Sequence, residues 1–185
     1  MTNILKPTSD NIVSVFIDLQ ARLLEKISGA ERIVSRNIFL LEGARVLGIP
    51  FLATTQYKKG LGELDPLFAS RLDRQSPDKA TFSCYGDAQI REQLLNSGRK
   101  WVAVSGVETH ICVMQTTLDL LREGYRVAVV ADAIGARGKL DHEIGIRRME
   151  QSGALLVTAE MLLYELLGRS DGEAFKKLLP LIKNG

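Results

Sequence analysis

Short apolar runs rich in β-branched residues recur along the chain and alternate with stretches of helical spacing. The runs are bounded by turn signals, and their lengths suit strands rather than helices. Because their apolar residues are continuous rather than alternating with polar ones, we expect strands that are buried on both faces. The predicted strands cover 12–18, 49–55, 101–107, 125–132 and 154–159.

Between these runs, apolar residues fall three or four positions apart, as they do along one face of a helix. The first such segment runs from Val34 to Leu47 and stops at Gly48. Alternating strands and helices need crossover connections, which place helices on both faces of a parallel sheet. The pattern therefore predicts an α/β fold, a three-layer α-β-α sandwich with a mostly parallel, doubly wound sheet of about five or six strands. The other predicted helices cover 88–98, 110–124 and 142–153.

Length and composition fit one domain over residues 1–185, with 45% hydrophobic and 25% charged residues and no low-complexity tract. The net charge is only +2 and the basic residues are scattered, so we expect no nucleic-acid partner. The N-terminal segment MTNILKPTSDN lacks a signal-peptide pattern, and no run approaches the ~20 apolar residues of a membrane span. These features predict a cytoplasmic protein without a membrane partner.

Two segments stand outside the alternation. The stretch 56–79 is predicted to be irregular, and loops of that length over the carboxyl edge of a sheet often form part of a binding site. The tail 173–183 is basic and amphipathic, which suits a helix on a membrane surface or a helix docked on the domain or on another subunit. We favour docking.

An aspartate and a cysteine follow two of the predicted strands. Asp18 ends the first strand, where its carboxylate would face the crevice at the carboxyl edge, although helix capping would also explain it. Cys112 lies in the first turn of a helix, where the helix dipole favours a thiolate. The alternative for Cys112 is a small buried apolar side chain. Lys79, at the end of the long loop, would stabilise both anions, and Asp18 could accept the thiol proton.

The segments that carry these residues are DLQ at 18–20, KATFS at 79–83 and GVETHICV at 106–113. Together they resemble the isochorismatase-like (cysteine hydrolase) superfamily, and the similarity covers nearly the whole chain. The QYKKGLG loop and the segment VVADAIGAR at 129–137 are similar to its isochorismatase domain-containing subgroup.

The resemblance implies a catalytic triad of Asp18, Lys79 and Cys112. It also implies a cis peptide between Val107 and Glu108, which would turn the N–H groups of Glu108 and Cys112 into an oxyanion hole. Weaker correspondences suggest that four residues line the substrate pocket: Gln20, Tyr57, Phe82 and Arg137. Asp132, which ends a strand as Asp18 does, is expected to make structural hydrogen bonds instead.

Family members that retain the cysteine cleave amides or carbamoyl groups, so the resemblance implies an enzyme that hydrolyses non-peptide C–N bonds in a small molecule through a thioester-like intermediate. It implies no cofactor and a homo-oligomer. Nicotinamidases in the family bind a metal through histidines after the second strand, but TTQYKKGLG has none, so we expect no metal. His110 and His142 are expected to be structural.

Other functions remain open at this point. The same thiol could serve a redox-responsive protein, or the pocket could hold a ligand without catalysis. A dinucleotide-binding domain would need a glycine-rich turn after the first strand, and DLQARLL has none. The even charge distribution argues against a ribonuclease.

Overall fold

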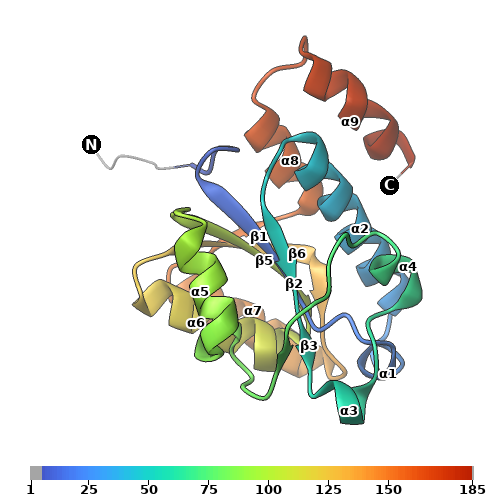
Figure 1. The fold of residues 1–185 in the computed structure, drawn as a ribbon, viewed down its shortest axis with the longest axis vertical. Coiled ribbons are helices and arrows are strands. Elements are labelled where there is room, and N and C mark those ends of the chain that lie inside the picture. Colours follow the sequence, from blue (N-terminus) through green and yellow to red (C-terminus); the bar gives the residue numbers. More distant parts are fainter. Residues whose placement is uncertain (1–5, 185) are drawn as a thin grey trace.

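A computed structural model of the chain describes residues 6–184, so the start of the segment that lacks a signal-peptide pattern lies outside the described residues. Its centre is a five-stranded parallel sheet in the order β2-β1-β5-β6-β7 (Figure 1). The prediction of a parallel, doubly wound sheet is confirmed. The strands are β1 (Ile12–Ile17), β2 (Phe51–Ala53), β5 (Trp101–Val107), β6 (Arg126–Gly135) and β7 (Leu155–Val157).

Helices cover both faces of this sheet, as the crossover argument requires. One face is packed by α2 (Ala30–Val46), α8 (Ala159–Leu167) and α9 (Glu173–Asn184), and the other by α5 (Ala88–Asn96), α6 (Met114–Arg122) and α7 (Lys139–Gln151). The two groups lie on opposite sides of the strands in Figure 1. The molecule is therefore the three-layer sandwich that the sequence predicts.

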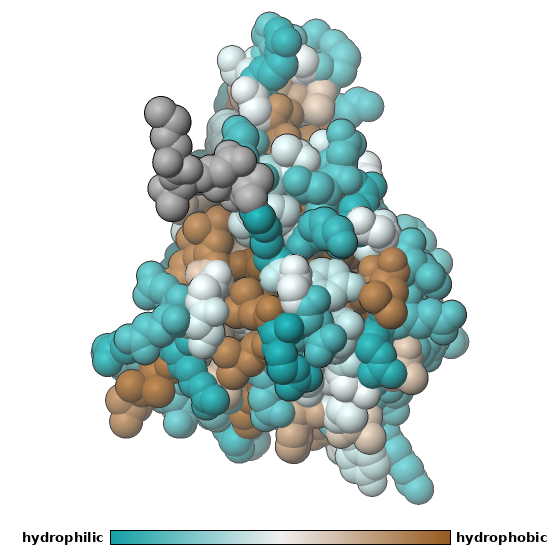
Figure 2. All heavy atoms as spheres, turned by 90° about the vertical axis from the view of Figure 1, so that its left-hand side faces the viewer, coloured by the Kyte–Doolittle hydropathy of each residue, from teal (hydrophilic) through white to brown (hydrophobic). Residues whose placement is uncertain are grey.

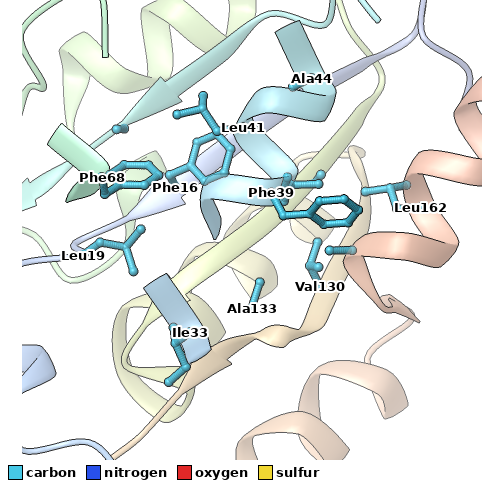
Figure 3. Packing of buried hydrophobic residues seen from close by; sticks show 14 of the residues in the cluster. Phe16, Leu19, Ile33, Phe39, Leu41, Ala44, Phe68, Val130, Ala133 and Leu162 are labelled. Carbon is cyan, nitrogen blue, oxygen red and sulfur yellow. The ribbon is translucent and has the colours of Figure 1, made fainter. Parts of the chain in front are cut away.

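The strands contribute side chains to two separate hydrophobic cores, because successive side chains of a strand point to opposite faces of the sheet. In β1, Ile12 and Phe16 join the core under α2, whereas Val13 and Val15 join the core under α5 and α6. Figure 3 shows the first of these cores, where the Phe16 and Phe68 rings pack with their centroids 5.4 Å apart. This double burial explains the continuous apolar runs in the sequence.

The stretch 56–79 is more ordered than its sequence suggests, so the prediction of an irregular loop is wrong there. Its ends form a two-stranded parallel ribbon in which Gln56 pairs with Lys79. Elements of two to four residues are too short to leave a periodic pattern in the sequence. They are β3 (Thr55–Gln56), α3 (Lys58–Leu61), α4 (Pro66–Ala69) and β4 (Asp78–Lys79); the short helix α1 (Ala21–Leu24) follows β1.

The basic amphipathic tail forms α9, which docks on the domain, as we expected. Leu178 is fully buried in the core under α2, and Leu181 and Ile182 pack against the same core. Across residues 6–184, the helices fall short of the length and apolar character that crossing a bilayer requires.

Candidate functional site

Asp18 sits directly after β1 and is completely buried. Its φ of 50° lies in the left-handed region, which short polar side chains tolerate better than most others. Both carboxylate oxygens are engaged: the Thr54 hydroxyl donates to Oδ1 at 2.7 Å, and Lys79 Nζ donates to Oδ2 at 2.6 Å. Asp18 therefore does not cap a helix and is held instead at the carboxyl edge of the sheet.

Lys79 reaches Asp18 from β4, and neither side chain is exposed to solvent. The ammonium also donates to Gln56 Oε1 at 2.6 Å and to the Phe82 carbonyl oxygen at 3.2 Å. Burial is the largest single effect and would lower the pKa of Lys79, but the charge and hydrogen bond of Asp18 together with the two nearby cysteines outweigh it, so the pKa is raised overall. Lys79 is therefore a hydrogen-bonded cationic partner of Asp18 at neutral pH.

Cys112 follows β5 in a short π-helical turn, Thr109–Val113, that leads into α6. Cys112 is 5% exposed, and its sulfur lies 4.0 Å from Gln56 Oε1. Burial and then the charge of Asp18 raise the pKa of Cys112, against the opposing effect of Lys79. This direction opposes the predicted thiolate, because desolvation and a nearby carboxylate favour the neutral thiol over the effect of the lysine.

The fold explains why these three side chains meet. After β1 the chain forms β2 on one side of β1 and later returns to form β5 on the other side. The strand order therefore reverses between β1 and β5. Ligands of doubly wound proteins bind at such a reversal, beyond the carboxyl ends of the strands. Asp18 follows β1 and Cys112 follows β5, while the β3–β4 ribbon brings Lys79 to the same edge.

The bond between Val107 and Glu108 is a cis peptide, at the place where the resemblance implies one. The Glu108 carbonyl accepts hydrogen bonds from the N–H groups of Ile111 and Val113, and these close the turn that carries Cys112. The Glu108 carboxylate accepts from the Arg137 backbone N–H at 2.9 Å and pairs with its guanidinium at 3.2 Å. Arg137 is thereby tied to the cysteine loop.

The remaining residues expected to bind substrate lie in different surroundings. Gln20 is completely buried: its Nε2 donates to the carbonyls of Gln56 and Gly62, and its Oε1 accepts from the Gln56 N–H. Tyr57 and Phe82 flank the Gln56–Lys79 ribbon and are 58% and 54% exposed. Gln20 thus braces the ribbon, whereas the two aromatic side chains are free to meet a ligand.

Three residues of the cluster were missed by sequence reasoning. Thr54 holds Asp18, Gln56 contacts both Lys79 and Cys112, and Cys84 lies with its sulfur 3.8 Å from the Thr54 hydroxyl. Burial raises the pKa of Cys84 to about 11. The polar run TTQ at 54–56, placed after an apolar strand as Asp18 is, was the available signal for two of them.

Asp132 and the histidines sit outside this cluster. Asp132 accepts from the Ala159 N–H at 2.7 Å and pairs with Arg36 at 2.9 Å, which confirms its structural role. The Thr109 hydroxyl lies 2.9 Å from His142 Nδ1, and burial lowers the pKa of His142. Within residues 6–184, no three histidine, cysteine or acidic side chains come together in a way that could hold a metal ion.

The fold and site define a doubly wound α/β protein with a buried Asp–Lys–Cys cluster at the point where the strand order reverses. The isochorismatase domain matches residues 13–161, and the chain belongs to the isochorismatase family.

Similar proteins agree with this assignment. Isochorismatase domain-containing protein 1 of Salmo salar is 36% identical over 170 residues, which are 90% of this chain, and the chain spans 59% of that relative's length. The structure of MAR1 ribonuclease from Caenorhabditis elegans is 35% identical with a TM-score of 0.90, covering 97% of this chain and 93% of that one. YcaC of Escherichia coli, described as an octameric hydrolase of unknown specificity, is 22% identical with a TM-score of 0.90 and shares the fold over 100% of this chain and 96% of its own. The chain therefore has the fold of a hydrolase family.

Proposed function

We propose that the chain hydrolyses a small amide or carbamoyl compound with Cys112 as the nucleophile, Asp18 as the proton carrier and Lys79 as the charge that holds Asp18 ionised. The observation that carries the proposal is the fully buried Asp18–Lys79 pair beside a cysteine at the carboxyl edge of the sheet. Burying two charges costs several kcal/mol per ion, so a stability role alone is a poor explanation for the pair.

In the first half of the reaction, the thiol proton passes to Asp18 as the sulfur attacks the carbonyl carbon. The raised pKa of Cys112 favours this coupling, because it disfavours a free thiolate before attack. The C–N bond of the tetrahedral intermediate then breaks, and Asp18 returns the proton to the departing nitrogen. An amine leaves and a thioester on Cys112 remains.

In the second half, water attacks the thioester. Asp18 takes a proton from the water, the C–S bond breaks, and the proton returns to sulfur, so the products are a carboxylic or carbamic acid and the starting enzyme. The backbone N–H groups of Glu108 and Cys112 are proposed to stabilise the oxyanion in both halves. Tyr57 and Phe82 are proposed to contact the substrate, and Arg137 to orient Glu108.

The test is turnover of a panel of small amides and carbamoyl compounds by the wild type, Cys112→Ala and the matched control Cys84→Ala. We expect Cys112→Ala to lose turnover with an unchanged circular dichroism spectrum, Cys84→Ala to retain it, and intact mass to show an acyl adduct on Cys112 with slow substrates. Turnover by Cys112→Ala would contradict the proposal.

A second candidate function is RNA cleavage, which the name of the C. elegans relative, MAR1 ribonuclease, favours. The net charge of +2 and the scattered basic residues argue against a phosphate-backbone site. Adding RNA to the substrate panel separates amide hydrolysis from RNA cleavage. Peroxide treatment of Cys112 tests the redox-responsive alternative. Location in the cytoplasm stays a prediction.

A further inference from the structure

Gln56 contacts both the lysine and the cysteine of the buried cluster, although the proposed hydrolysis gives it no part. It lies on β3 and is 8% exposed. Its side-chain oxygen Oε1 accepts a hydrogen bond from Lys79 Nζ at 2.6 Å, the same length as the bond from Nζ to Asp18. The Cys112 thiol donates weakly to the same oxygen, with sulfur and oxygen 4.0 Å apart. One amide oxygen therefore faces both the charge and the nucleophile.

The orientation of this amide is fixed by its other hydrogen bonds. Gln56 Nε2 donates to the Ala80 carbonyl at 3.0 Å. A flipped amide would lose that bond and would place an N–H donor against the Lys79 ammonium, which has no acceptor. The backbone is held too, since the Gln56 N–H donates to Gln20 Oε1 at 2.7 Å and the Gln56 carbonyl accepts from Gln20 Nε2 at 3.1 Å. The oxygen is therefore held facing Lys79 and Cys112.

A fixed amide oxygen acts on its two neighbours in opposite ways. Its partial negative charge stabilises the Lys79 ammonium and disfavours a negative charge on the sulfur, and both effects are stronger where water is excluded. The three N–H donors of the ammonium are directed at oxygens of Asp18, Gln56 and Phe82. Burial and then Asp18 raise the pKa of Cys112, and the amide oxygen acts in the same direction. The resting arrangement therefore favours the thiol.

We propose that Gln56 is a positioning residue of this site, whose side-chain oxygen holds the Lys79 ammonium against Asp18 and keeps the hydrogen on the Cys112 sulfur in the resting protein. The resting sulfur then reacts slowly with other electrophiles, because the thiolate is the reactive form of a cysteine. A part for Gln56 in turnover rests on the proposed hydrolysis, whereas its effect on the free thiol does not.

A brace between the segment after β1 and the β3–β4 ribbon is the alternative explanation of the same hydrogen bonds. A brace acts through its bonds alone, so any substitution that breaks them loosens the ribbon and exposes the sulfur. An electrostatic effect instead follows the charge of the side chain, and its sign differs between a neutral apolar substitute and a carboxylate. The two explanations therefore predict different reactivities for Cys112 in two variants of Gln56.

The rate at which iodoacetamide alkylates Cys112 tests this proposal. Intact mass follows the reaction at constant pH in a Cys84→Ala background, so that one thiol is counted. Q56M removes the oxygen at nearly constant length and should react at least about threefold faster. Q56E adds a negative charge beside the sulfur and should react no faster than the parent. Q151E makes the same charge change at an exposed position on α7 and should react at the parent rate.

Unchanged or slower alkylation of Q56M, or faster alkylation of both Q56M and Q56E, overturns the proposal. Circular dichroism shows whether each variant is folded. If Q56M does not fold, Q56N replaces it with the same expected direction, because the shorter side chain withdraws the oxygen.

With a substrate from the amide panel, Q56M should lower kcat more than it raises KM, because Lys79 and Asp18 act on the proton transfer. Absence of turnover by the wild type would remove the proposed hydrolysis and would leave alkylation to decide the role of Gln56. The failure of the further inference and the failure of the proposed function are therefore distinguishable.

Discussion

Asp18 and Lys79 stabilise each other only as a pair, because each would be an uncompensated charge in the core without its partner. Neither side chain is exposed, and the ammonium has two further oxygen partners. Removing one member of a buried pair costs far more than the pair itself contributes. Stability and chemistry are therefore coupled at these two residues.

Lys79→Met should lower the free energy of unfolding by about 3–5 kcal/mol, since it leaves the Asp18 carboxylate buried without a counter-charge. Urea denaturation at neutral pH measures the loss. Lys177→Met, at an exposed position on α9, is the matched control and should change stability by less than about 0.5 kcal/mol. A small effect at Lys79 would mean that the pair is not buried in solution.

The pKa of Cys112 makes a prediction of its own. Because burial and Asp18 raise it, the thiolate fraction in the free protein is below that of an ordinary thiol at pH 7–9 and increases as pH rises. In a Cys84→Ala background, alkylation by iodoacetamide should rise about tenfold per pH unit through this range. Intact mass measures the alkylation rate. A rate that levels off below about pH 8 would show that the pKa of Cys112 is lowered instead.

At the scale of elements, β1 and β5 approach so closely at Gly106 that no side chain fits. Gly106 has φ +108°, and a methyl group there would overlap the Ile17 carbonyl oxygen. Gly153 has nearly the same φ, +103°, with open space around it. A comparison of alanine substitutions at the two glycines therefore separates the cost of a positive φ from the cost of a steric clash with β1.

Gly153→Ala should lower the free energy of unfolding by about 1–2 kcal/mol, because an L residue is strained at a positive φ. Gly106→Ala should cost a further ~1–3 kcal/mol, because the strands must separate where the site is assembled. Urea denaturation of both variants gives the difference. Equal costs would show that β1 and β5 can shift apart without penalty.

At the scale of the whole molecule, apolar side chains remain on the outside of two helices. Leu140 and Ile144 on α7, and Met161 and Tyr164 on α8, are exposed. Figure 2 shows one face of the molecule, where hydrophobic residues reach the surface in several places between hydrophilic ones. Contacts between copies of the chain would cover such side chains.

We therefore propose that the chain forms a homo-oligomer. Light scattering coupled to size-exclusion chromatography should give a mass that is a multiple of 20.4 kDa. Introducing a charge at an exposed apolar position, as in Ile144→Glu, should lower that mass if α7 is in the contact, and Leu95→Glu on α5 is the comparison. A mass of one chain at micromolar concentration would contradict the proposal.

The sequence by itself determined the sandwich, the parallel sheet and the placing of Asp18 and Cys112 after strands, because hydrophobic periodicity and position along a strand are local properties. Only the tertiary structure decided what those residues meet. The ribbon that delivers Lys79, the contact of Gln56 with both Lys79 and Cys112, and the raised pKa of the thiol all depend on groups far apart in the chain. Burial and the charges of distant neighbours set these properties, and no local pattern records them.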